Sequence, residues 1–193
     1  SDVFAVMCRT GGEGPGGVSC LLVEKGVEGL SFGKQEKKMG WNSQHTSMVN
    51  FDNCQIPLEN IVGNEGEGFK IAMQGLDGGR VNIAACSLGG ARAALEASIS
   101  YSAERKQFGK SIDQFQVTQF KLADMATELE ASRLMVLRAA SSLDAKDPQA
   151  TKLCAMAKRF TTDICSNICD MGLQIHGGYG YLKDFPLERL VRD

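Results

Sequence analysis

Three groups of residues in this 193-residue chain combine glycine with side chains that can bind a ligand carrying phosphate groups. Glycine lets a backbone approach a ligand closely and leaves its N–H donors uncovered. Arginine can donate two parallel hydrogen bonds to a pyrophosphate. The groups are Gly75-Leu76-Asp77-Gly78-Gly79-Arg80, Arg105-Lys106-Gln107-Phe108-Gly109 and Gln174-Ile175-His176-Gly177-Gly178-Tyr179-Gly180-Tyr181. Together they predict a surface that receives a large, flat, phosphate-bearing ligand.

Each group also has a purely structural explanation. Arg105 can be a cation at the end of a helix, where it complements the helix dipole, and Gly109 is then expected to stop that helix. Gly177 can be an ordinary helix-ending glycine. For Gly78 and Gly79 the ligand explanation is favoured, because each glycine inside a helix costs roughly 1 kcal/mol relative to alanine. We assign His176 no catalytic role.

The bulk composition excludes several classes of function. A formal net charge of −2 and a pI of about 5.8 argue against a nucleic-acid partner, which requires a basic face. No apolar run approaches the ~18 residues of a membrane span, so we expect no membrane insertion. The seven cysteines show no disulfide pattern, and Cys165 and Cys169, one helical turn apart, lack companion ligands. We therefore expect reduced thiols and no metal site.

The first 63 residues have β-rich runs separated by turns, and the rest has helical periodicity. The glycine-rich segment 11–17 lacks the Lys-Ser/Thr of a phosphate-binding loop and leads into a strand, so it is expected to connect a hairpin. Asn64 is a candidate N-cap, and the small-residue surface Gly89-Gly90-Ala91 is expected to allow close helix packing. The expected strands are 3–9, 18–24, 30–32 and 47–51, and the expected helices are about 69–105, 116–143, 149–175 and from 186 onward. The predicted fold class is α+β, with a partial β-barrel or sheet piece followed by an antiparallel four-helix-type bundle.

These motifs, in this order, resemble the acyl-CoA dehydrogenase family over essentially the whole chain. The resemblance also covers Met39-Gly40-Trp41, segment 51–63, Glu65-Gly66-Glu67-Gly68-Phe69 and segment 116–126. Segments 40–44 and 176–184 are most similar to the branch of the family that acts on isobutyryl-CoA. The short-chain and 2-methyl-branched relatives remain alternatives.

The resemblance implies an oxidoreductase acting on CH–CH bonds, in fatty acid and branched-chain amino acid catabolism. Its cofactor would be FAD, its substrate a short branched-chain acyl-CoA, and its electron acceptor an electron-transferring flavoprotein. It would form a homodimer or homotetramer in the mitochondrial matrix, or in the cytoplasm of a bacterium. The residues implied to bind FAD are Arg105, Phe108, Gln116, Gln174, Ile175, His176, Gly177 and Gly178. Those implied to line the acyl-CoA channel are Asp77, Gly78, Gly79 and Arg80.

The catalytic base of the family is not expected within this chain. In some branches it is a glutamate at the position that matches Gly79, and in the others it lies beyond the segment that matches Val191-Arg192-Asp193. Residues 1–63 would then be the later part of the middle β domain, and 64–193 a helical domain truncated before its last helix. We expect this chain alone to be inactive. The alternatives are a non-catalytic helical assembly module and a CoA-binding protein of the same fold.

Overall fold

The first part of the chain folds into two antiparallel hairpins. The computed structural model describes residues 2–193, so residue 1 of the predicted β domain lies outside the described residues. Strand β1 (Val3–Arg9) pairs with β2 (Val18–Glu24), and β3 (Leu30–Gln35) pairs with β4 (Ser47–Phe51). All four predicted strands are confirmed, although β3 continues three residues beyond its predicted end. The segment 11–17 connects β1 to β2, as predicted.

The first long helix begins at Gly68, and the prediction of Asn64 as its N-cap is wrong. Glu67 instead turns back, and its Oε2 accepts hydrogen bonds from the backbone N–H and the side-chain amide of Asn64, each at 3.0 Å. These bonds lower the pKa of the Glu67 carboxyl below its usual value. Gly68 is required where the helix meets β2, because a Cβ there would lie 2.4 Å from the carbonyl carbon of Ser19.

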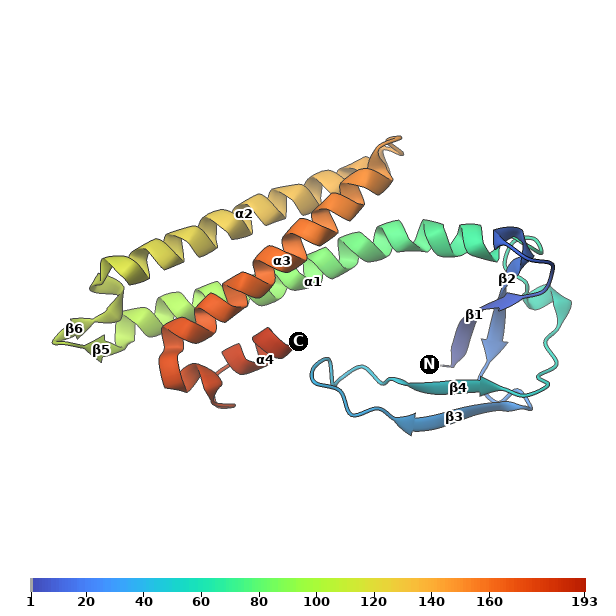
Figure 1. The fold of residues 1–193 in the computed structure, drawn as a ribbon, viewed down its shortest axis with the longest axis horizontal. Coiled ribbons are helices and arrows are strands. Elements are labelled where there is room, and N and C mark those ends of the chain that lie inside the picture. The colour runs from blue at the N-terminus through green and yellow to red at the C-terminus, as the bar shows by residue number, and fades with distance from the viewer. Residues whose placement is uncertain (1) are drawn as a thin grey trace. The chain divides into compact units, whose positions relative to one another are not determined.

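Four α-helices make up most of the rest of the described chain: α1 (Gly68–Glu104), α2 (Gln116–Asp144), α3 (Ala150–His176) and the short α4 (Leu187–Arg192) (Figure 1). The α+β fold with small antiparallel sheets and a helical bundle is confirmed. The chain forms two compact units that divide within α1, after Leu76. The domain boundary after residue 63 stays a prediction. Within the described residues, no helix combines the length and apolar character needed to cross a membrane.

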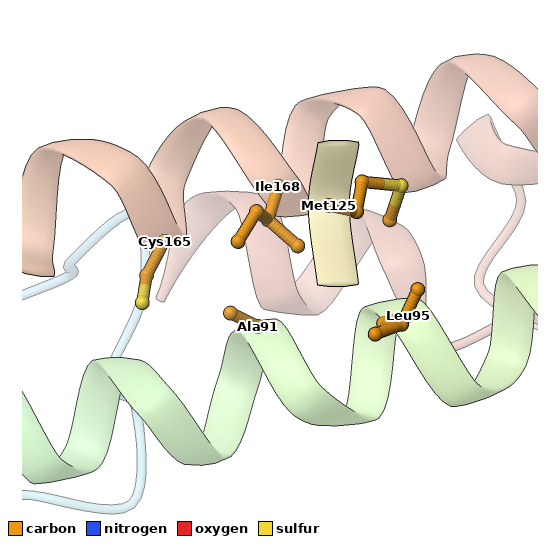
Figure 2. Packing of buried hydrophobic residues seen from close by; sticks show 5 residues of the cluster. All are labelled: Ala91, Leu95, Met125, Cys165 and Ile168. Carbon is orange, nitrogen blue, oxygen red and sulfur yellow. The ribbon is translucent and has the colours of Figure 1, made fainter. Parts of the chain in front are cut away.

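The centre of the bundle is a cluster of buried apolar side chains from three helices (Figure 2). Met125 of α2 is fully buried between α1 and α3. Burial raises the pKa of the Cys165 thiol to about 12 and that of Cys169 to about 11. No group of side chains in residues 2–193 is arranged to hold a metal ion. The cluster consists of Ala91, Leu95, Met125, Cys165 and Ile168. Cys165 and Cys169 are therefore core residues, and all seven cysteines are free thiols.

The glycine that permits close helix packing is Gly172 of α3. A Cβ there would lie 3.1 Å from both the Leu187 side chain of α4 and the Ser98 hydroxyl of α1. Of the predicted small-residue segment 89–91, Ala91 packs in the buried central cluster as predicted, whereas the described chain packs little against the two glycines. A Cβ at Gly89 would meet nothing within 4 Å among the described residues, and one at Gly90 would only touch Leu190 at 4.0 Å.

Candidate functional site

The second glycine-containing group forms a small hairpin directly after α1. Strand β5 (Lys106–Gln107) pairs with β6 (Lys110–Ser111), with Phe108 and Gly109 at the tip. Their φ angles of +54° and +82° fit a type I′ turn, which requires positive φ at both central residues. Gly109 therefore turns the hairpin, and the prediction that it stops the helix is wrong. The hairpin leaves the Phe108 side chain 93% exposed.

The third group forms a tight loop after α3, and its glycines serve different purposes. Gly177, with φ of +59°, ends the helix. Gly180 lies against the chain itself, because a Cβ there would lie 2.4 Å from the carbonyl oxygen of Leu173. A Cβ at Gly178 would meet nothing within 4 Å of the described chain. Among these three glycines, Gly178 alone has neither a positive φ nor a close neighbour in the described chain, so its backbone faces open space.

His176 holds this loop against α1. The side chain is 3% exposed, and its Nδ1 lies 2.8 Å from the Gly172 carbonyl oxygen. Its ring stacks on Tyr101 with centroids 4.2 Å apart, and the Tyr101 hydroxyl donates to the His176 carbonyl at 3.3 Å. Phe185 contacts both rings edge-on. Sequence reasoning missed Tyr101, whose only signal is its position one helical turn before Arg105.

Two neighbouring cavities lie against the hairpin and the loop. The first, of about 470 Å³, is lined by Arg105, Ile175, His176, Gly177 and Gly178 together with Tyr101, Gln107, Ile112, Tyr179 and Leu182. The second, of about 380 Å³, is lined by Phe108, Gln174 and Ile175 together with Gln107, Ile112, Phe115, Val117, Thr118 and Lys121. Seven of the eight predicted cofactor residues thus line one or both cavities. Gln116 lines neither, although its neighbours Phe115 and Val117 line the second.

The arginine in this site is Arg105, which lines the first cavity, while Lys121 lines the second. The Arg105 guanidinium carbon lies 5.4 Å from the centre of the Tyr179 ring, within the range of a cation–π contact. Among residues 2–193 the guanidinium has no carboxylate partner. The site therefore combines a cation available to an anion, an open backbone at Gly178 and an exposed aromatic ring at Phe108. This set can bind a ligand that carries both a pyrophosphate and a flat ring.

The first glycine-containing group occupies the other end of α1. Arg80 Nη1 donates to Asp77 Oδ1, and Thr151 Oγ1 of α3 donates to Asp77 Oδ2 at 2.6 Å. A Cβ at Gly78 or Gly79 would meet nothing within 4 Å of the described residues. At 1.5 Å per residue, Arg80 and Arg105 are ~37 Å apart along the helix. The structure therefore does not bring this group to the two cavities within one chain.

Comparison with known proteins shows which family and which proteins this chain resembles. The family described as "Acyl-CoA dehydrogenase, C-terminal domain" matches residues 66–193. The mitochondrial isobutyryl-CoA dehydrogenase of Bos taurus is 55% identical over the whole chain and 46% of its own length. The caffeyl-CoA reductase-Etf complex subunit CarC of Acetobacterium woodii is 46% identical over 94% of the chain and 48% of its own length.

A solved structure shows the same fold. The butyryl-CoA dehydrogenase of Megasphaera elsdenii superposes with a TM-score of 0.96 at 41% identity, and the match covers 100% of this chain and 50% of that one. The chain therefore spans about half the length of the relatives it matches. The predicted resemblance is confirmed.

Proposed function

This chain belongs to the acyl-CoA dehydrogenase family, and on that premise we propose that its protein forms the α,β double bond of a short branched-chain acyl-CoA such as isobutyryl-CoA. The enzymes of this family are oxidoreductases acting on CH–CH bonds. The observation that carries the proposal is the convergence of Arg105, Phe108 and the segment 174–178, at the end of α3 and the start of the loop after it, on two neighbouring cavities. The 55% identity to isobutyryl-CoA dehydrogenase supports the choice of acyl group.

The residues around the cavities fit FAD. Arg105, which has no carboxylate partner in residues 2–193, would bind the pyrophosphate, and the exposed Phe108 ring would cover an apolar ring face of the nucleotide. The Gln174 amide can both donate and accept hydrogen bonds, and Gln116 lies next to the second cavity at the start of α2. When bound, FAD supplies the acceptor for the hydride that leaves the substrate. The contribution of this surface is to bind and orient the cofactor.

The distance along α1 supports an assembly of at least two copies. Arg80, in the proposed acyl-CoA channel, and Arg105, in the proposed FAD surface, are ~37 Å apart along one helix, too far to serve a single reacting centre. We propose that residues 105–109 and 174–178 bind the FAD of a neighbouring copy in a homodimer or homotetramer. The 93% exposure of Phe108 agrees with a surface that is covered only in the assembly.

Asp77, the one carboxylate in the glycine-containing segment 75–80, is not suited to be the catalytic base. Position 79 has no side chain, and both oxygens of Asp77 already accept hydrogen bonds, from Arg80 and Thr151. A base that removes the α-proton needs a carboxylate free to accept it. We propose that the base is supplied by residues outside these 193, so that the chain by itself is inactive.

The relatives support a proposal for the partner and the compartment. CarC is a subunit of a complex with Etf, the electron-transferring flavoprotein, and 46% of its aligned residues are identical to those of this chain. We propose that the protein passes its electrons to such a flavoprotein. The Bos taurus relative is mitochondrial, so the mitochondrial matrix is the proposed location, or the cytoplasm if the source is bacterial.

Anaerobic reduction of the flavin tests the proposal. The full-length protein, purified with FAD, should lose its yellow absorbance on addition of isobutyryl-CoA. Arg105→Gln should weaken flavin retention about 10- to 100-fold, because a charge-assisted hydrogen bond is lost. The 193-residue chain with FAD should stay yellow. A full-length protein that binds isobutyryl-CoA but leaves the flavin oxidised would instead be a CoA-binding protein of the same fold.

A further inference from the structure

A side chain outside all three glycine-containing groups completes the polar cluster at the proposed acyl-CoA channel. Thr151 lies in the first turn of α3 and is 74 positions from Asp77 in the sequence. Its hydroxyl donates to Asp77 Oδ2 at 2.6 Å, while Asp77 Oδ1 accepts from Arg80 Nη1. The carboxylate thus receives one donor from its own helix and one from the neighbouring helix.

This pairing restricts the Asp77 carboxylate and, through it, Arg80. A carboxylate held at one oxygen only can rotate about its last bond, whereas donors at both oxygens fix its plane. The side chain of Asp77 is 16% exposed and that of Arg80 is 34% exposed, so the ion pair is partly shielded from solvent. A guanidinium has five N–H donors, and only one of those of Arg80 is bound to Asp77. The remaining donors are held in a defined direction for a ligand.

Among residues 2–193, the hydrogen bonds to the Asp77 carboxylate come from Arg80 and Thr151. Cys154, one turn after Thr151, is fully buried beside the pair. Burial raises the pKa of its thiol, and the negative charge of Asp77 raises it further, while the positive charge of Arg80 lowers it. Among the described residues the thiol makes no hydrogen bond to Asp77, so Thr151 is the donor that α3 contributes.

We propose that Thr151 is a positioning residue for acyl-CoA binding: it fixes the Asp77 carboxylate, which in turn orients the Arg80 guanidinium toward the polar part of the substrate. The inference rests on the proposed function, since it places Arg80 in the acyl-CoA channel. Orienting a flexible arginine before the ligand arrives lowers the entropy lost on binding. Thr151 therefore affects the affinity for the substrate and not the rate of the chemical step.

Steady-state kinetics of the full-length, FAD-containing protein test this role. Thr151→Val keeps the branched shape and removes the donor, and Thr151→Ser restores the hydroxyl. With isobutyryl-CoA, Thr151→Val should raise KM about fivefold, because the Arg80 side chain must then be ordered at the moment of binding, and should leave kcat within about twofold. Thr151→Ser should return KM to the wild-type value. An unchanged KM in Thr151→Val, or a raised KM that serine does not restore, overturns the proposal.

Thr162→Val is the matched control on the same helix. The Thr162 hydroxyl donates only within α3, to the Lys158 carbonyl at 2.9 Å and the Arg159 carbonyl at 3.4 Å. The same substitution there should leave both KM and kcat unchanged. A KM raised equally by both valine variants would indicate a general effect of threonine loss on α3 and would contradict a specific role of Thr151.

Crystal structures of the two valine variants test this inference independently of the proposed function. If the wild-type flavin is not reduced by any short acyl-CoA, the proposed function fails, but the positioning of Arg80 remains measurable. In Thr151→Val the Arg80 guanidinium should leave its position on Asp77 or lose its order, and in Thr162→Val it should not move. An Arg80 that is equally ordered on Asp77 in both variants overturns the proposal.

Discussion

Replacing Gly180 by alanine tests whether the loop after α3 is held in place by the chain's own backbone. The added Cβ would lie 2.4 Å from the Leu173 carbonyl oxygen and 3.2 Å from the His176 Cβ. The carbonyl belongs to the last turns of α3 and cannot rotate away, so the loop must move. Overpacking of this kind costs about 1–3 kcal/mol. A cost of about 2 kcal/mol corresponds to a fall in Tm of roughly 4–8 °C for a chain of this size.

The assay is thermal unfolding of the flavin-free protein, followed by circular dichroism. Gly178→Ala is the matched control, because its Cβ would meet nothing within 4 Å of the described residues, and its stability should stay within about 0.5 kcal/mol of wild type. Gly180→Ala should also retain less FAD, since Gly177 and Gly178 move with the loop. A Gly180→Ala protein as stable as wild type, or a Gly178→Ala protein equally destabilised, would refute this reasoning.

Three further substitutions or reactions test other parts of the structure. Met125→Ala should lower the free energy of unfolding by about 3 kcal/mol, measured in urea, because it leaves a cavity in a fully buried cluster; a loss below 1 kcal/mol would contradict this packing. Because hydrogen bonds from Asn64 lower the pKa of Glu67 in the folded state, its contribution to stability is present above about pH 4.5 and is lost as the pH falls through the folded pKa. The stability difference between wild type and Glu67→Gln should therefore shrink in acid, and a difference that is constant from pH 3 to 7 would be inconsistent with it. At pH 8 iodoacetamide should alkylate the exposed Cys86 and not Cys165, whose pKa of about 12 keeps it protonated; peptide mass mapping that finds Cys165 modified in the folded protein would show that the core opens.

Strands and long helices were predictable because their sequences contain strong periodic patterns. Strands β1, β2 and β4 have the predicted bounds, and each long helix begins or ends within two residues of its predicted position. The β5–β6 hairpin was missed because its strands are two residues long and polar. Its turn also places Phe108, an aromatic residue, at positive φ, and aromatic residues give no turn signal.

The glycines and the site contacts were less predictable because their reasons lie far away in the sequence. The segment Gly89-Gly90-Ala91 was assigned to helix packing as a small-residue surface, yet Ala91 lies in the buried cluster while open space surrounds Gly89 in the described chain. Gly172 packs against α1 and α4, and Thr151 reaches Asp77 across 74 positions. Such contacts depend on how the helices are aligned against each other, and a local sequence pattern does not determine this alignment. The cofactor residues were found from the resemblance, since physical reasoning left Arg105 open between a helix terminus and a phosphate ligand.

The crystal structure of the full-length protein with FAD tests the central claim most directly. The account predicts that the Arg105 guanidinium hydrogen-bonds the FAD pyrophosphate, with Phe108, the end of α3 and the loop after it (residues 174–178) against the same nucleotide. It also predicts that this FAD lies next to the acyl-CoA site of a different copy of the chain. An FAD that contacts neither Arg105 nor the loop in any copy would contradict the account.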